Sequence, residues 1–295
     1  MALATEFEQN IADEIERNRG QMVPVKASLM ERLFVKKARW QQLHPNPDDE
    51  FCFPSIGPNY QILSDYANQL VHLHDSNTEF WKDPLIVQKV YPDGYMILNG
   101  HHRWGAAMKV NFNPLPISIV NLTQETDIEE MIRKSRHNKR VTLDLDEVVF
   151  CRGDEPAEKG LSFPFRHWYR ERIRCGIPAL LHYLSKQDYD IWVYTAKYYS
   201  FDYIRAYFRH YSVRLDGIIT GSARKGWLHE EAKKRMETLL RNQYEETLHI
   251  DSGAVVRTGQ IGKRYEEYSF EASGGEWAQA VMKIVEGLAQ GRDNT

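Results

Sequence analysis

The chain has 295 residues, a formal net charge of −3 at pH 7, 42% hydrophobic residues and 12% aromatic residues. This length suggests two domains with packed cores, and the nearly balanced charge argues against wholesale binding to nucleic acids or membranes, although a local basic patch stays open. The three cysteines, Cys52, Cys151 and Cys175, are widely spaced. They argue against a disulfide framework or a zinc site and indicate reduced thiols.

The first 22 residues predict an amphipathic helix. Leu3, Phe7, Ile11 and Ile15 recur four positions apart, which is typical of a stripe that packs on a domain or forms a dimer contact. No apolar run approaches the roughly 20 residues that span a bilayer, and the acidic N-terminus lacks the features of a targeting peptide. We therefore expect a cytoplasmic protein with no membrane partner, and the oligomeric state stays open.

Residues 23–122 predict a domain of mixed α and β structure. Apolar, β-branched segments alternate with turn residues, and an Ala- and Met-containing segment favours a helix. The expected elements are strands at 83–91, 95–98 and 115–122, a turn at Pro92-Asp93-Gly94, and a helix that begins near His101.

The polar stretch 123–140 predicts a linking helix and the domain boundary. From residue 141 onward, short strands alternate with helical patterns, which favours a parallel, doubly wound sheet. The first expected strand begins at Val141, and the next three cover 189–196, 215–221 and 246–252. In such sheets the loops at the carboxyl ends of the strands carry the chemistry.

Chemically active side chains follow the ends of these strands. Asp144 and Asp146 close the first, Thr195 closes the second, Lys225 follows the third, and Asp251 closes the fourth. One carboxylate can attack a phosphoryl group while a second, two positions on, serves as acid and base. Carboxylate oxygens also hold Mg²⁺, and a hydroxyl and an ammonium neutralise the charge of the transferring group.

These segments resemble the haloacid dehalogenase-like (HAD) hydrolase superfamily across about residues 140–290. The matching motifs are DLDEV, VYTAK, SARKG and HIDSG. The resemblance implies a Rossmannoid parallel sheet with helices on both faces, and a Mg²⁺-dependent phosphatase or phosphotransferase that forms an aspartyl-phosphate. It implies Asp144 as nucleophile, Asp146 as acid and base, Thr195 and Lys225 as phosphate-neutralising residues, and Asp144, Asp146 and Asp251 as metal ligands. Lys233 and Lys234 are alternatives to Lys225. Ser252 follows Asp251, as in the small-phosphatase branch that acts on protein tails.

The short spacing between these motifs leaves no room for a large cap domain. Only a flap near 150–172 fits between the first two motifs, so the site is expected to be open, as suits a macromolecular substrate or one covered by a neighbouring domain. The flap contains FRHWYRERIR at 165–174. This run has two interpretations: a grip for a phosphate-bearing polymer, or, as we favour, a solvated basic helix face with Trp168 and Tyr169 buried.

In the first domain, the segment GYMILNGHHRWGAAMKV combines a strand, a turn and a helix. Gly100 permits a tight turn, and the free N–H groups at the following helix N-terminus favour an anion. His101, His102 and Arg103 add side-chain donors, so this element predicts a phosphate site.

The same element resembles the ParB/sulfiredoxin superfamily across about residues 23–122, with LHPNP at 43–47, DPLIV and ILNGHHR as the matching segments. The resemblance implies a nucleotide (ATP, ADP or CTP), often with Mg²⁺. The implied contacts are Asn99, Gly100, His101, His102 and Arg103. His101 stands where the reductases have a reactive cysteine, and Asn99 stands where kinase-type members usually have aspartate.

Together these features predict a phosphatase or phosphotransferase coupled to a nucleotide-binding domain. The phosphorylated substrate is a small molecule, a protein or a nucleic-acid end. Two alternatives stay open, both led by the first domain: a free amino-acid or small-molecule kinase, and a regulatory protein that binds nucleotide or nucleic acid.

Overall fold

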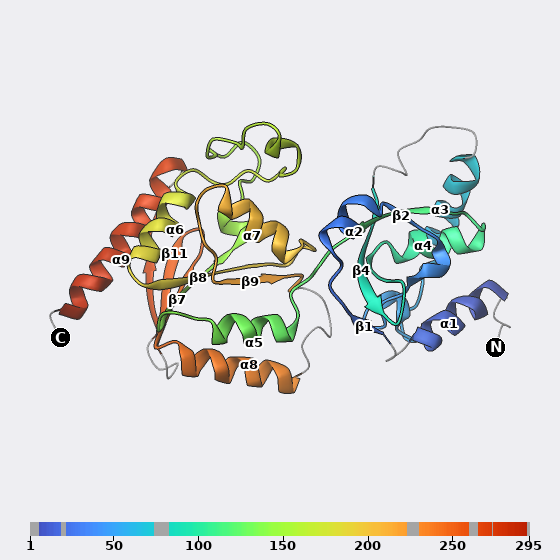
Figure 1. Cartoon of the computed structure of the whole chain (residues 1–295), viewed down its shortest axis with the longest axis horizontal. Helices are drawn as coiled ribbons and strands as arrows, with labels where there is room; N and C mark the ends of the chain where they lie inside the picture. Colours follow the sequence, from blue (N-terminus) through green and yellow to red (C-terminus); the bar gives the residue numbers. More distant parts are fainter. Residues whose placement is uncertain are drawn as a thin grey trace. The chain divides into compact units, whose positions relative to one another are not determined.

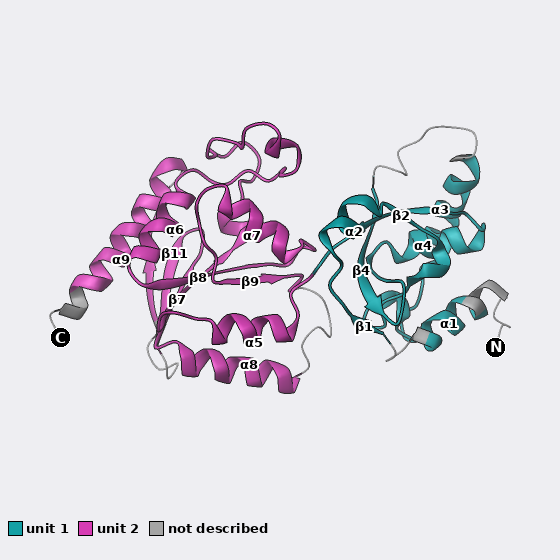
Figure 2. Ribbon diagram, viewed as in Figure 1, with its two compact units in different colours: residues 1–121 teal, residues 122–295 magenta. Residues whose placement is uncertain are grey.

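A computed structural model describes residues 6–18, 22–73, 83–222, 230–259, 265–272 and 274–293. The chain divides into two compact units, residues 1–121 and residues 122–295 (Figure 2). Each unit has its own sheet and its own core, and each is described by itself.

The first unit is built on a mixed sheet with strand order β2-β6-β4-β5-β3, and β1 pairs with β4 (Figure 1). Strands β4 and β6 run parallel, whereas β4 and β5 form an antiparallel pair. Its strands are β1 Val23–Pro24, β2 Lys37–Ala38, β3 Leu43–His44, β4 Leu85–Tyr91, β5 Tyr95–Asn99 and β6 Leu115–Ile119. Its helices are α1 Glu6–Asn18, α2 Leu29–Phe34, α3 Tyr60–Leu73 and α4 His101–Lys109.

The helices and strands expected around the glycine turn are confirmed in the first unit. Strands β4, β5 and β6 occupy the expected segments, and α4 begins at His101. Their apolar residues form the core together with Ile11 of α1, and Ile15 packs against it, so these two residues of the stripe pack on this unit. Leu3 lies outside the described residues.

The second unit has a sheet with strand order β12-β11-β10-β7-β8-β9. Its strands are β7 Lys139–Asp144, β8 Tyr189–Thr195, β9 Gly217–Thr220, β10 Glu246–Ile250, β11 Ala254–Gly259 and β12 Tyr265–Ser269. Its helices are α5 Glu125–Arg133, α6 Ile177–Lys186, α7 Phe201–Arg209, α8 Glu230–Gln243 and α9 Trp277–Asp293.

The expected parallel sheet is confirmed for part of the second unit only. Strands β10, β7, β8 and β9 are parallel neighbours, as expected. The expectation was wrong for the remaining edge, because β11 and β12 extend the sheet in antiparallel fashion. A hairpin needs only a short turn, so these strands follow β10 without the helical crossover by which parallel strands are recognised.

Both faces of this sheet are covered, as burial along β8 shows. Ile191 and Val193 pack into a core with residues of α6, α7 and α9, whereas Trp192 packs on the opposite side with residues of α5 and α8. Helix α5 contributes Ile128 and Ile132 to that second cluster. The segment 123–140 is therefore an integral part of the second unit and not a linker.

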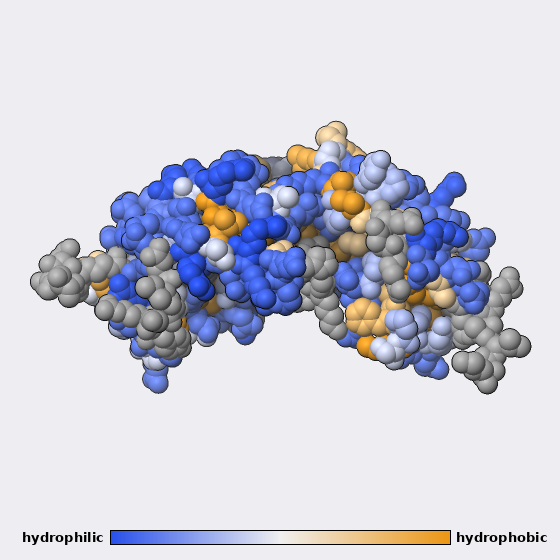
Figure 3. Space-filling model, turned by 90° about the horizontal axis from the view of Figure 1, so that it is seen from below, coloured by the Kyte–Doolittle hydropathy of each residue, from blue (hydrophilic) through white to orange (hydrophobic). Residues whose placement is uncertain are grey.

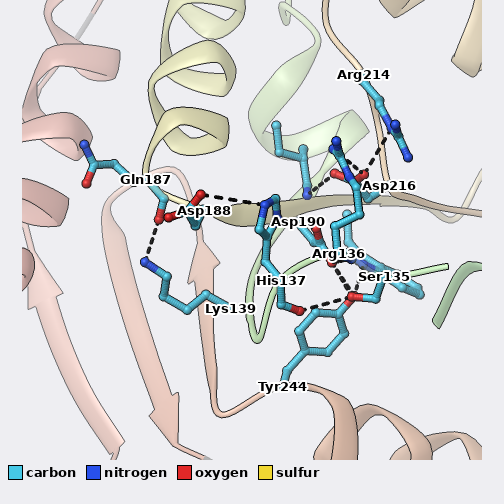
Figure 4. A network of polar contacts seen from close by, with 12 residues as sticks. Ser135, Arg136, His137, Lys139, Gln187, Asp188, Asp190, Arg214, Asp216 and Tyr244 are labelled. Carbon is cyan, nitrogen blue, oxygen red and sulfur yellow. Dashed lines mark hydrogen bonds and ion pairs between the residues drawn. The ribbon is translucent and has the colours of Figure 1, made fainter. Parts of the chain in front are cut away.

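A buried polar network lies where β7 and β8 begin (Figure 4). Asp144 and Thr195 lie at the other ends of these strands. Asp190 is 0% exposed, and it accepts hydrogen bonds from the Ser135 hydroxyl, the backbone N–H of Arg136 at 3.3 Å and the Tyr244 hydroxyl at 3.2 Å. His137 Nδ1 lies 2.8 Å from its other oxygen. These contacts join the segment before β7 to the start of β8, so they fix how these two neighbouring strands begin.

One face of the molecule is mainly polar. On the face shown in Figure 3, hydrophilic residues predominate and the hydrophobic patches are small. Within the described residues, every helix is too short or too polar to cross a lipid bilayer.

We predict that Asp190→Asn lowers the free energy of unfolding by about 1–3 kcal/mol, because the new amide group would face the Ser135, Arg136 and Tyr244 donors in a buried site. The matched control is Asp188→Asn, since Asp188 is largely exposed and asparagine tolerates its positive φ of 60°. Urea denaturation of both variants measures the difference. Equal losses in the two variants would contradict this role for Asp190.

Candidate functional site

The carboxyl end of β7 holds the first carboxylate of the candidate site. Asp144 is the last residue of β7, and a π-helical turn over residues 145–149 follows it. Asp144 Oδ1 accepts hydrogen bonds from the backbone N–H of Asp146 at 2.6 Å and of Glu147 at 2.9 Å. Among the described residues no hydrogen bond reaches Oδ2 of Asp144, so this oxygen is the one placed to react.

Strand register brings the other predicted residues to the same edge. Asp144 pairs with Tyr194, which directly precedes Thr195, and Leu143 pairs with Ile250, which directly precedes Asp251. Burial raises the pKa of Tyr194, and the charges of Asp144, Asp251 and Glu147 raise it further. These carboxylates therefore lie within electrostatic reach of a single phenol.

The second carboxylate of the DLDEV motif, Asp146, is held by a hydroxyl and an ammonium group. Thr195 Oγ1 donates a hydrogen bond of 2.6 Å to Asp146 Oδ2, and Lys197 Nζ lies 2.9 Å from Asp146 Oδ1. Oδ1 is buried and accepts no hydrogen bond, since Lys197 approaches it as an ion pair outside hydrogen-bonding geometry. Thr195 is itself fixed, because its backbone carbonyl accepts from Ser222 Oγ at 3.1 Å.

The cation beside Asp146 is one that the sequence analysis did not select. Lys197 follows Thr195 by two positions in VYTAK, and that spacing was the available signal. Lys225 lies outside the described residues. The alternatives Lys233 and Lys234 are exposed on α8.

Asp251 lies just beyond β10 and is exposed. Its Oδ1 accepts from the backbone N–H of Ser252 at 2.6 Å. The carbonyl of Ser252 in turn accepts from Trp277 Nε1 at 2.7 Å, and Trp277 is buried at the start of α9. The core thus anchors the loop that presents the Asp251 carboxylate.

Two of the three carboxylates expected as Mg²⁺ ligands fit that role. Among the described residues no group of three His, Cys, Asp or Glu side chains could hold a metal ion. Mg²⁺ commonly takes one or two carboxylates and completes its shell with water and phosphate oxygens. Asp144 Oδ2 and the exposed Asp251 fit that pattern. The Asp146 carboxylate, expected as a third ligand, is instead engaged by Thr195 and Lys197.

The flap that follows the DLDEV motif differs from the expected basic helix. Residues 150–176 are largely irregular, with one 3₁₀ turn at Phe165–His167 and isolated bridges at Phe150–Ile173 and Ala157–Arg174. Trp168 is exposed, so its expected burial was wrong, whereas Tyr169 packs against the core as expected. The described part of this segment contains no large cap.

In the first unit, the glycine turn has the expected form. Gly100 has a φ of +105°, a conformation that favours glycine, and it precedes α4 directly. A Cβ atom there would lie 2.9 Å from Leu85 and 3.1 Å from Arg103 Nη2. The backbone N–H groups of the first turn of α4 therefore follow a close, glycine-dependent turn, and Asn99 ends β5 just before it.

The histidine side chains of this element contact other segments of the first unit. His101 is 4% exposed, and its Nε2 accepts from the backbone N–H of Asn46 at 3.2 Å. His102 Nε2 accepts from the backbone N–H of Asn59 at 3.0 Å. Both imidazoles thus accept a hydrogen bond at Nε2, whereas their side chains were expected to donate to a phosphate.

Arg103 is also buried and has an internal partner. Its Nη1 lies 3.0 Å from Asp83 Oδ2 and donates to the Asp83 carbonyl. The three quoted segments therefore converge: His101 holds LHPNP through Asn46, and Arg103 holds DPLIV through Asp83. The backbone N–H groups at the start of α4 are candidates to bind an anion at this turn.

The family comparison matches a segment that contains this turn and extends into α5 of the second unit. Residues 66–135 match the family model described as the ParB N-terminal domain, so the expected ParB-like domain is confirmed for that segment. The chain is similar to the C-terminally truncated chromosome-partitioning protein ParB from Caulobacter crescentus, whose structure contains CTP-γ-S. The identity is 24%, with 35% of this chain and 55% of that chain covered, and the TM-score is 0.23.

The matched region runs from within α3 to just beyond α5. The chain spans about half the length of that ParB structure, and the low TM-score supports no further conclusion. None of the curated proteins matches the chain.

We predict that His101 makes the fold sensitive to acid. Burial lowers its pKa from 6.5 to about 4, although the nearby Asp49 opposes this shift. The unfolded chain therefore binds a proton that the folded chain does not, so stability is full above pH 6.5 and falls as the pH drops towards 4. Urea midpoints at pH 7 and pH 5 should differ less for His101→Gln than for the wild type. The control His182→Gln, at an exposed position, should keep the wild-type dependence; an equal flattening in both variants would contradict the assignment.

Proposed function

We propose that the second unit is a HAD-like, Mg²⁺-dependent phosphohydrolase or phosphotransferase with Asp144 as its nucleophile. One observation carries the proposal: Asp144 keeps one carboxylate oxygen clear of hydrogen bonds, beside Asp146, which Thr195 and Lys197 hold in place. A nucleophile and an acid-base group at one strand end are the pair that covalent phosphoryl transfer requires.

The proposed reaction has two steps, formation and hydrolysis of an aspartyl-phosphate. Asp144 Oδ2 attacks the phosphorus, the bond to the leaving oxygen breaks, and the carboxylic acid proton of Asp146 passes to that oxygen. A water molecule then attacks the phosphorus and gives its proton to Asp146, so the bond to Asp144 breaks and phosphate is released. An alcohol in place of water makes the same second step a phosphotransfer.

Other side chains of the site serve charge and position. The Thr195 hydroxyl fixes the Asp146 carboxylate, and the Lys197 ammonium offsets the negative charge that gathers there. Asp144 and Asp251 would hold Mg²⁺, which when bound supplies charge neutralisation to the phosphoryl oxygens. The phenol of Tyr194 stays protonated near these carboxylates, because burial and their charge raise its pKa.

We predict that Asp144→Asn abolishes Mg²⁺-dependent hydrolysis of p-nitrophenyl phosphate, because an amide is too weak a nucleophile to form the covalent intermediate. The expected loss in kcat is at least about 10³-fold. The control Asp154→Asn changes a carboxylate on the exposed flap and should keep wild-type activity. Full activity of Asp144→Asn would refute the proposed nucleophile.

A second candidate function belongs to the first unit. The family match supports this function and gives no support to the phosphatase. We propose that this unit binds a nucleotide at the turn before α4 and acts as a regulatory module. The backbone N–H groups and positive dipole end of α4 suit a polyphosphate. The kinase alternative is less favoured, because Asn99 provides no carboxylate at the end of β5.

We predict that CTP, ATP or ADP with Mg²⁺ raises the melting temperature, because a ligand that binds only the folded chain stabilises it. Arg103→Lys should weaken this shift, since lysine keeps a charge for Asp83 but loses the planar fork that supports the turn. Asp144→Asn should leave the shift unchanged. The absence of a shift with all three nucleotides in the wild type would exclude nucleotide binding at this turn.

A further inference from the structure

The flap between β7 and α6 exposes aromatic rings where burial would be the ordinary outcome. Phe163 is 72% exposed and Trp168 is 64% exposed. Large aromatic side chains usually bury their apolar area, and exposed ones bordered by polar residues indicate an interaction surface. We name this surface the flap face and define it by Phe163, Arg166, His167, Trp168 and Arg170, all of them exposed.

The flap face rests on a packed base. Tyr169 stacks on Tyr207 of α7 with ring centroids 4.8 Å apart and also contacts Tyr203 at 4.9 Å. The Tyr207 hydroxyl donates to the carbonyl of Glu171 at 2.6 Å, and the Tyr203 hydroxyl donates to the carboxylate of Glu171. Tyr169 and Glu171 thus secure the flap from below, while the neighbouring Trp168 points outward.

The same flap begins at the catalytic carboxylates. Arg152 Nε donates to the backbone carbonyl of Asp146 at 3.3 Å, and the Arg152 guanidinium forms an ion pair with Glu147. The ring of Phe150 lies 6.2 Å from that of Tyr199, whose pKa is raised by burial and also by the charges of Glu171 and Asp146. The flap is therefore continuous with the Asp144 site.

The outward charge of the flap face is positive. Among the flap carboxylates, Glu155 pairs with Arg174 and Glu158 accepts from the backbone N–H of Gly176 at 2.7 Å. The exposed Asp154 lies outside the flap face. Arg166 and Arg170 are exposed, and in the described parts of the chain their guanidinium groups have no ion pair or hydrogen bond. They are available to an anionic partner.

We propose that the flap face binds a single-stranded nucleic acid and directs its terminal phosphate into the Asp144 site. This inference rests on the phosphatase function and names its substrate class. Exposed rings offer stacking faces to successive bases, and arginines between them meet the backbone phosphates. A phosphopeptide would use the arginines but would leave Phe163 and Trp168 without planar groups to stack on.

The binding test uses Asp144→Asn protein, which cannot turn over its ligand, and a fluorescein-labelled ten-residue oligothymidylate with a 3′-phosphate. Fluorescence anisotropy should show a Kd that rises roughly 5- to 100-fold with Phe163→Ala or Trp168→Ala, the range that corresponds to one lost stacking contact. Trp168→Phe should restore binding. Phe34→Ala is the matched control, since Phe34 is 71% exposed in the first unit.

The arginines are tested through salt. Arg166→Ala and Arg170→Ala should each reduce the slope of log Kd against log salt concentration by about 0.7, the value for one phosphate contact to a single strand. In the active protein, Trp168→Ala should lower kcat/KM for the oligonucleotide phosphate and leave p-nitrophenyl phosphate hydrolysis unchanged.

The outcomes separate the two proposals. Nucleic-acid binding by the flap face is refuted if the oligonucleotide does not bind, or if Trp168→Ala binds it equally well. It is also refuted if a phosphoserine peptide binds more tightly and depends on Trp168. The oligonucleotide could instead bind in a Trp168-dependent way to a wild type that hydrolyses no phosphate ester. That result would support the flap face as a binding surface. It would refute the phosphatase function and the phosphate delivery that depends on it.

Discussion

The candidate active site depends on how the chain leaves β7. Two consecutive backbone N–H groups, those of Asp146 and Glu147, turn back onto one oxygen of Asp144. This contact breaks the strand, leaves the other Asp144 oxygen clear, and sets Asp146 against Thr195 on the neighbouring strand. Without it, Asp146 would continue along the strand and lie too far on to share a phosphoryl group with Asp144. Parallel register supplies the remaining convergence, because it places Asp251 beside the same edge.

Much of this edge was predictable from the sequence, because strand ends are marked by a change from apolar to polar residues and parallel register does the rest. Lys197 was not predictable in the same way. Its place beside Asp146 depends on the conformation after β8, where the Lys197 N–H bonds back to Thr195 Oγ1 at 3.0 Å. Loop conformation of this kind has no periodicity in sequence, whereas strands do.

The first unit shows the opposite limit of sequence reasoning. Its turn, its helix start and its glycine were foreseen, because each follows from a local backbone requirement. The roles of His101 and Arg103 were not, since residue type shows what a side chain can donate but not whether it is buried. Burial turned His101 into an acceptor for the loop at Asn46 and turned Arg103 towards Asp83. A motif can thus mark a turn through buried residues that shape it.

An open site also constrains what can be a good substrate. Electrostatic stabilisation of a transferring phosphoryl group strengthens when water is excluded, and a large cap domain would supply that exclusion. The described part of this flap is short and irregular, and its apolar residues are divided between an inward Tyr169 and an outward Trp168. The inward ring secures the flap on the core, whereas the outward ring gains burial only when a partner covers it. Under the proposed phosphatase function, a substrate large enough to lie across Trp168 would itself exclude water beside Asp144, which favours a polymer over a small phosphate ester.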